Sequence, residues 1–232
     1  MTLTWLLLHG TPLTPAVWAG VAERLEPTGL VLRPDLTSTG DPATLQRALA
    51  ERILALIGDL PGELHVVGHS FGGQVALDLA LAAAPGRVTS LTVICSRATP
   101  FAPFAETADG LRRGDPVDVD GAVQRWFRPR ELDPEGPVVA YARSCLRDAD
   151  RTAWADALDA IAVYDRTAAV AALDIPVTLI AGAFDQVATP MEMDGLRERI
   201  HGSRLHVLGG ASHMTPFADP DRLADLILGV SC

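Results

Sequence analysis

The sequence predicts an α/β fold: a doubly wound, mainly parallel sheet of about six strands, with helices on both faces and a helical insertion. Three observations predict it. Short apolar runs alternate with helical patterns, which is typical of parallel strands joined by crossover helices. The 232 residues are 48% hydrophobic, which is enough to bury one substantial core. A serine flanked by glycines stands at one strand-to-helix junction, in GHSFGG.

The apolar runs place the elements in order along the chain. Strands are expected at residues 3–8 (LTWLLL), 30–33 (LVLR), 64–68 (LHVVG), 88–94, 176–181 and 204–208. Helices are expected at residues 15–25, 42–58, 71–84, 190–200 and 220–229. Four helix starts place a side-chain acceptor at the N-cap and proline at the first helical position: Thr14-Pro15, Asp41-Pro42, Thr189-Pro190 and Asp219-Pro220. TPME at 189–192 is also a capping box, in which Glu192 can reach back to the Thr189 amide.

The alternation of strands and helices breaks between about residues 97 and 170. This stretch contains RWFRPREL, several charged residues and helical patterns such as RTAWADALDAI. It predicts a helical insertion between the fourth and fifth strands. The chain is therefore divided into a first core part (1–96), a helical cap (97–170) and a second core part (171–232).

Charge and cysteine content exclude several classes of partner. The net charge of −10 repels phosphate backbones and anionic lipid headgroups, so no nucleic-acid or membrane partner is expected. Cys95, Cys145 and Cys232 are far apart without metal-binding spacing, which indicates free thiols in a reducing compartment and no metal. The N-terminus lacks the basic region and cleavage site of a signal peptide. We expect a cytoplasmic protein, monomeric or homodimeric.

The stretch from Gly68 to Gly72 has the form G-x-S-x-G between a strand pattern and a helix pattern. In this context the serine sits in a strained turn that projects its hydroxyl from the sheet edge. Side chains at positions 68 and 72 would collide with the neighbouring strand and helix. A tight turn with an incidental serine is the alternative, but the context favours Ser70 as a nucleophile.

A serine hydroxyl needs a base, and His213 is the expected one. It lies in the glycine-rich loop GGASHMTPFADP, between the last strand and the last helix. Such a loop can carry an imidazole over the sheet edge. Structural positions account for the other five histidines, which lie in a loop, in strand patterns, beside the nucleophile or at a helix end: His9, His65, His69, His201 and His206.

The expected partner of the imidazole is Asp185, just past the fifth strand in LIAGAFDQVATP. It could instead be a loop carboxylate that satisfies backbone amides, although the loop after the fourth strand, ICSRATP, contains no acid. Two backbone amides are expected to bind the oxyanion. One is that of Phe71, directly after the nucleophile, and the other is that of Thr11, because Pro12 has no amide hydrogen.

These motifs resemble those of the α/β-hydrolase superfamily: LLLHG, GHSFGG, IPVTLIAGAFDQVATP and GGASHMTPFADP, in the order of that superfamily. The resemblance implies the α/β-hydrolase fold with a Ser70–Asp185–His213 triad. The segment from RWFRP to the fifth strand is similar to the cap of 3-oxoadipate enol-lactonases and similar small esterases. In those enzymes an RWF-like element lies over the active site, which here implies Trp126 and Phe127.

Aromatic and apolar residues near the sheet edge are expected to line an apolar pocket: Trp18, Phe71, Phe101, Phe104, Trp126, Phe127 and Met214. Each could equally belong to the core or to cap packing. Arg97, Arg125 and Arg128 lie in or near the cap. Any of them could hold a substrate carboxylate by two hydrogen bonds, or stay solvated at the surface.

The sequence therefore predicts a cofactor-free serine hydrolase that cleaves a small carboxylic ester or lactone through an acyl-enzyme. Two alternatives remain open. The same triad could perform a non-hydrolytic reaction, as in a lyase, a cyclase or a perhydrolase. The scaffold could also serve as a ligand receptor that hydrolyses its ligand slowly.

Overall fold

The computed structural model describes residues 3–58 and 60–229, and its centre is a parallel sheet of six strands in the order β2-β1-β3-β4-β5-β6. The strands are β1 (Leu3–Leu8), β2 (Leu30–Leu32), β3 (Glu63–His69), β4 (Ser90–Ile94), β5 (Val177–Gly182) and β6 (Arg204–Leu208). Every neighbouring pair is parallel. The predicted fold class is confirmed, and each expected strand is present within two residues of its expected bounds.

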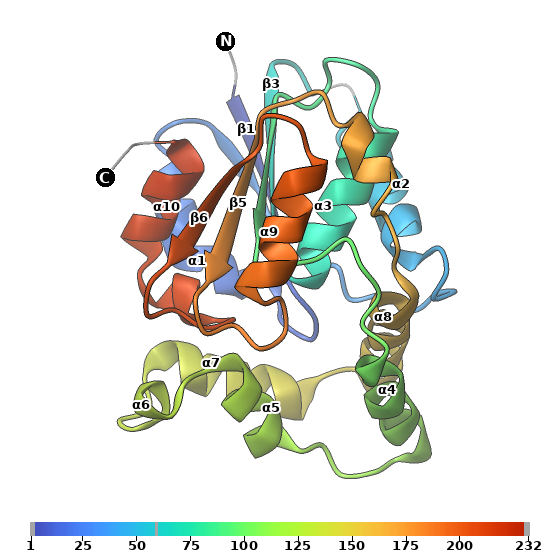
Figure 1. Cartoon of the computed structure of the whole chain (residues 1–232), viewed down its shortest axis with the longest axis vertical. Helices are drawn as coiled ribbons and strands as arrows, with labels where there is room; N and C mark the ends of the chain where they lie inside the picture. The colour runs from blue at the N-terminus through green and yellow to red at the C-terminus, as the bar shows by residue number, and fades with distance from the viewer. Residues whose placement is uncertain (1–2, 59, 230–232) are drawn as a thin grey trace.

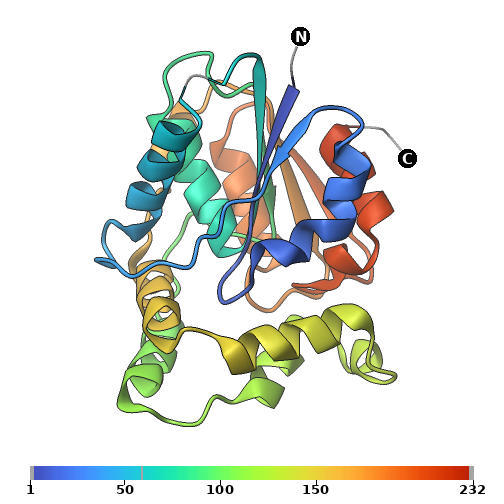
Figure 2. The same ribbon diagram turned by 180° about the vertical axis from the view of Figure 1, so that it is seen from behind.

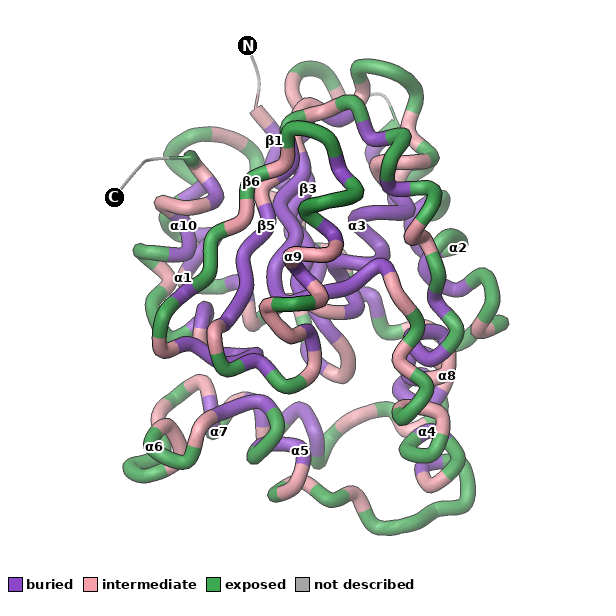
Figure 3. Tube along the Cα trace, in the orientation of Figure 1, coloured by how far each residue is buried: buried purple, intermediate pink, exposed green. Residues whose placement is uncertain are grey.

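Helices cover both faces of the sheet (Figures 1 and 2). The elements outside the cap are η1 (Pro15–Trp18), α1 (Ala19–Leu25), α2 (Leu45–Leu56), α3 (Phe71–Ala82), α9 (Pro190–Arg199), η3 (Thr215–Ala218) and α10 (Pro220–Leu228). Helices α1 and α10 pack together on one face, whereas α2, α3 and α9 lie on the other. The strands between them are almost wholly buried, apart from β2 and β6 at the edges (Figure 3).

Two details of the helix starts differ from prediction. Helix α2 begins at residue 45 rather than 42, because Asp41 accepts from the Ala43 amide at 2.9 Å and forms a separate turn first. Thr189 caps α9 by accepting from the Glu192 amide at 3.3 Å, as expected. The Glu192 carboxylate, however, does not reach back to Thr189, because Arg97 and Thr99 bind it instead.

Between β4 and β5 the chain leaves the sheet and forms the predicted helical insertion, which we call the cap. Its helices are α4 (Pro103–Arg113), α5 (Val119–Trp126), α6 (Pro129–Leu132), α7 (Pro137–Asp148) and α8 (Arg151–Val163), followed by the short η2 (Ala169–Ala172). The cap lies beyond the carboxyl ends of the strands, toward which the arrows of Figure 1 point. This is the edge at which open α/β sheets bind their ligands.

A buried ionic cluster fixes the chain where it returns from the cap to the sheet. Arg166 binds both carboxylate oxygens of Asp78 on α3, at 2.6 and 3.0 Å. The Tyr164 hydroxyl donates to the Gln74 carbonyl at 3.0 Å and to Asp78 at 3.2 Å. The carboxylate of Asp78 is therefore fully paired although it is buried. No helix in the part of the chain that the structure describes is long and apolar enough to cross a membrane.

Candidate active site

The turn between β3 and α3 holds Ser70 in a backbone conformation that L-residues rarely adopt. Its φ is 54° and its ψ is −121°, and its amide donates to the Ile94 carbonyl of β4 at 3.0 Å. A side chain at Gly68 would collide with the Gly72 carbonyl, and one at Gly72 with the Leu8 carbonyl. The two glycines therefore permit the close approach of strand and helix on which the strained turn depends.

His213 and Asp185 form a buried pair, with 2.8 Å between Nδ1 of the imidazole and Oδ2 of the carboxylate. The other carboxylate oxygen of Asp185 accepts from the amides of Val187 and Ala188 at 2.7 and 3.0 Å. Burial by itself would raise the pKa of Asp185, but the charge of His213 and these hydrogen bonds outweigh it and lower that pKa. An ionised Asp185 accepts a hydrogen bond from Nδ1–H of His213, which leaves Nε2 as the unprotonated ring nitrogen.

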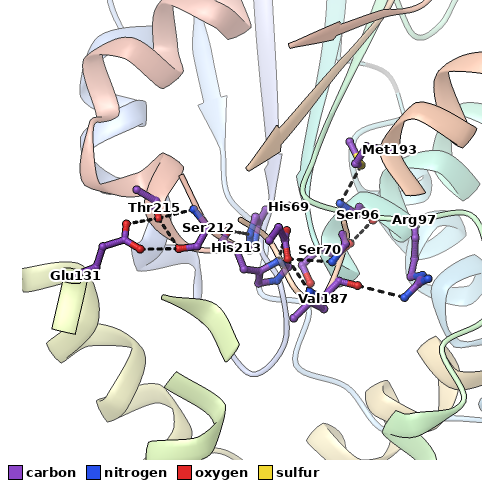
Figure 4. Close-up of polar contacts among 12 residues, drawn as sticks. His69, Ser70, Ser96, Arg97, Glu131, Val187, Met193, Ser212, His213 and Thr215 are labelled. Carbon is purple, nitrogen blue, oxygen red and sulfur yellow. Dashed lines mark hydrogen bonds and ion pairs between the residues drawn. The ribbon is translucent and has the colours of Figure 1, made fainter. Parts of the chain in front are cut away.

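Ser70 and His213 line the same narrow cavity of about 40 Å³ under the cap. Figure 4 shows them next to each other, with Val187 of the Asp185 loop beside them. The three residues of the predicted triad come from the loops after β3, β5 and β6. The structure thus brings a strained serine and a carboxylate-bound imidazole to one pocket.

Both predicted oxyanion donors are close to Ser70, one along the chain and one in the wall of its cavity. Phe71 is the first residue of α3, and Thr11 lines the cavity that contains Ser70. Among the described residues, neither amide donates a hydrogen bond to another backbone carbonyl. Both are therefore free to bind an oxygen of a bound ligand, with the N-terminus of α3 adding its favourable dipole.

Some of the predicted pocket residues line the cavity that contains Ser70, and others lie in the core. Trp126 and Phe104 line the cavity with Ser70 and His213. Trp18, Phe127 and Met214 are buried but are not among its lining residues, in contrast to the prediction. Trp18 packs edge-on against Phe217, at 5.0 Å between ring centroids, and belongs to the core under α1. Met214 and Phe127 are buried in the same core cluster.

Three apolar residues of α8 form much of the cavity wall and were not predicted: Trp154, Leu158 and Ile161. Their spacing of four and three positions places them on one helix face. This spacing is visible in RTAWADALDAI and was the available signal. A larger cavity of about 260 Å³ adjoins this one, and Trp154 and Thr11 line both. Trp154 is therefore part of the wall of both cavities.

The three arginines singled out in the sequence have different surroundings. Arg97 is buried and binds Glu192 at 2.9 Å and the Val187 carbonyl at 3.2 Å. Arg128 pairs with Glu131 at 3.2 Å and lies over the ring of Phe184. Arg125 lines the cavity and forms no hydrogen bond or ion pair within residues 3–58 and 60–229. Of the three, Arg125 is the one available to a ligand.

One cluster of potential metal ligands overlaps the site: nitrogen and sulfur atoms of His69, Cys95 and His213 lie within 4.8 Å of one another. Burial, and then the charge of Asp185, raises the pKa of the Cys95 thiol well above its ordinary value. The thiol keeps its proton, and metals bind the thiolate. The imidazole of His213 is already committed to Asp185. This cluster is poorly suited to a metal ion.

Comparison with known proteins agrees with this fold. The sequence pattern described as the "Alpha/beta hydrolase family" matches residues 5–226. The pimeloyl-[acyl-carrier protein] methyl ester esterase of Nitrosomonas europaea is 37% identical, over 94% of this chain and 91% of the relative. The 3-oxoadipate enol-lactonase 1 of Acinetobacter baylyi is 28% identical, over 80% of this chain and 70% of the relative. The crystal structure of a hydrolase from Pseudomonas aeruginosa superposes with a TM-score of 0.88 and 26% identity, covering 99% of this chain and 91% of that one.

Proposed function

Because this chain belongs to the alpha/beta hydrolase family and is a carboxylic ester hydrolase, we propose that it cleaves a small ester or lactone through an acyl-enzyme on Ser70. The observation that carries the proposal is the 2.8 Å pair of His213 and Asp185, together with the fact that His213 and Ser70 line the same cavity. The carboxylate fixes the tautomer in which Nε2 of His213 is unprotonated. That nitrogen is the base that the Ser70 hydroxyl needs.

In the first half of the reaction, Ser70 Oγ attacks the acyl carbon while His213 Nε2 takes its proton. The carbonyl oxygen becomes an oxyanion held by the amides of Thr11 and Phe71, each of which supplies about 3 kcal/mol of transition-state stabilisation. The tetrahedral intermediate collapses, and His213 returns the proton to the leaving alkoxide. In a lactone the leaving hydroxyl remains attached to the acyl group. Throughout, Asp185 stabilises the imidazolium.

In the second half, a water molecule attacks the acyl carbon of the ester on Ser70. His213 Nε2 removes a proton from that water, and the same two amides bind the second oxyanion. Collapse breaks the bond to Ser70 Oγ, which takes the proton back from His213. The products are the free acid and the regenerated enzyme, and no cofactor enters the reaction.

The walls of the cavity support a substrate with an apolar acyl part and an anionic group. Trp126, Trp154 and Leu158 supply apolar surface, and Arg125 supplies a cation without an ion-pair partner among the described residues. The two relatives described above are named for a methyl ester of a carrier-bound pimeloyl group and for an enol-lactone. An ester or lactone of a small dicarboxylic acid fits both the apolar wall and the cation.

The direct test is Ser70→Ala with p-nitrophenyl acetate and butyrate as substrates. We expect kcat to fall by at least about a thousand-fold, because the nucleophile is gone and only oxyanion stabilisation and binding remain. A fluorophosphonate should label the wild-type protein and not the variant. Circular dichroism and the melting temperature verify that the variant is folded. Wild-type turnover by a folded Ser70→Ala protein would refute the mechanism.

A further inference from the structure

The cap stretch RWFRPREL contacts the loop of His213 on both sides of the histidine. Glu131, in α6, binds the hydroxyls of Ser212 and Thr215 at 3.0 and 2.6 Å (Figure 4). The Met214 amide donates to the Trp126 carbonyl at 3.3 Å. Ser212 and Met214 are the chain neighbours of His213. Both residues that flank the base are therefore bonded to the cap rather than to the sheet that carries the loop.

The direction of these hydrogen bonds follows from the charge on Glu131. An ionised carboxylate only accepts, so both hydroxyls donate to it. The Thr215 oxygen is then free to accept from the Ser212 amide, at 2.8 Å. Burial would raise the pKa of Glu131, but the hydrogen bonds from Thr215, the Arg128 amide and Ser212 outweigh it and lower that pKa. Glu131 thus stays ionised and orders the hydroxyls of the loop.

Other contacts hold His213 from the sheet side. Its side chain pairs with Asp185, its carbonyl accepts from His69 Nε2 at 3.1 Å, and the Ala211 carbonyl of its loop accepts from the Phe184 amide at 2.8 Å. The histidine loop begins with two successive glycines, Gly209 and Gly210, which leave its backbone conformationally free. Proton transfer needs the imidazole placed to within a fraction of an ångström, because a displacement of about 1 Å can cost about a hundred-fold in rate.

We propose that Glu131 is a positioning residue for His213, so that the cap, through Glu131, holds the catalytic base in place. The inference rests on the proposed function, because it needs His213 to be the base. Glu131 is not among the residues lining the cavity, so it acts through Ser212 and Thr215 and not on the substrate. Any displacement of α6 that breaks these two bonds removes part of the support of the histidine loop.

The test compares Glu131→Ala with Glu131→Gln. Alanine removes every acceptor, and we expect kcat to fall about 10-fold, by the same factor for p-nitrophenyl acetate and butyrate, with KM unchanged. The rate of fluorophosphonate labelling should fall by that factor too, since it needs the same base. Glutamine can accept from one hydroxyl and donate to the other, so its kcat should stay within about 3-fold of wild type.

The matched control is Glu135→Ala, which removes another cap carboxylate. Glu135 binds Arg143 at 2.9 Å, within the cap, and should leave kcat at the wild-type value. Should Glu131→Ala fail to fold, Thr215→Val breaks the same contact from the core side with nearly the same shape and should lower kcat in the same way. Wild-type kcat in Glu131→Ala or, if that variant does not fold, in Thr215→Val would overturn the inference, as would a change confined to KM. The proposed function fails separately, through turnover by Ser70→Ala.

Discussion

The buried imidazole of His69, next to Ser70 in the chain, makes the stability of this protein depend on pH in a way that one substitution can isolate. Its Nε2 donates to the His213 carbonyl, and its Nδ1 has no hydrogen-bond partner among the described residues. Burial, and then the charge of His213, lowers the pKa of His69 from 6.5 to about 3. In the folded protein the imidazole is therefore neutral over most of the acidic range.

The sign of the effect follows from the protons bound by each state. In the unfolded chain His69 takes up a proton below about pH 6.5, whereas the folded protein does so only near pH 3. Between these values the unfolded state binds more protons, so the free energy of unfolding falls as the pH decreases. The slope is about 1.4 kcal/mol per pH unit, or about 5 kcal/mol over the window. The total free energy of unfolding of a folded domain is only about 5–15 kcal/mol.

His69→Gln keeps an amide donor for the His213 carbonyl and removes the titratable group. At neutral pH the variant should be the less stable protein, because it loses the ring contact with Phe217, at 4.9 Å between centroids. Below about pH 6.5 the difference should shrink by about 1.4 kcal/mol per pH unit and can change sign. Urea unfolding followed by tryptophan fluorescence, between about pH 7 and 4, measures both free energies.

The carboxyl groups also titrate in this range, but they do so in both proteins, so the difference between the two curves isolates His69. His206→Gln, a replacement of an exposed histidine on β6, is the matched control. Unfolding free energies that run parallel for wild type and His69→Gln across the window would refute the reasoning. They would mean that the imidazole at position 69 is already reachable by water and protons in the folded protein.

Two further predictions concern the substrate. Trp154→Ala should join the cavity at Ser70 to the neighbouring 260 Å³ cavity, so that kcat/KM rises about 4-fold for each methylene that the larger space takes up, at about 0.8 kcal/mol each. p-Nitrophenyl esters of increasing acyl length measure this, Trp154→Phe is the control that keeps the wall, and an unchanged length profile contradicts the prediction. Arg125→Met should lower kcat/KM for monomethyl adipate about 5-fold relative to methyl hexanoate, as expected for about 1 kcal/mol from a partly exposed ion pair. Equal loss for both esters would show that Arg125 does not bind the carboxylate.

The sheet and the loops that bear the proposed triad could be predicted because their signals are local. Each strand is an apolar run of its own, and the turn at Ser70 is specified by Gly68 and Gly72, which lie within two positions of it. The loops of Asp185 and His213 each follow directly on a strand. Parallel strands end at one edge of a sheet, so the meeting of these loops follows from the fold alone.

The cavity walls could not be predicted in the same way. Whether an aromatic residue faces the cavity or the core depends on how the cap helices rotate and dock, and composition does not reveal it. Trp18 and Trp126 are both buried tryptophans, yet the first packs against Phe217 and the second lines the cavity. The face of α8 could have been found from the spacing of its apolar residues. Whether that face points toward Ser70, in contrast, depends on how the cap packs on the sheet.

The proposed nucleophile and the proposed base thus depend on different parts of the molecule. The geometry of Ser70 is set by glycines within two positions along the chain. The geometry of His213 depends on contacts between residues that are far apart in the sequence. His213 and Asp185 are 28 positions apart, and Glu131 lies 81 positions from Ser212 and 84 positions from Thr215. Substitutions in the cap should therefore displace His213 and slow proton transfer to it, while the turn at Ser70 stays intact. If such variants keep the strained serine but react slowly with fluorophosphonate, the cap acts on catalysis through the histidine.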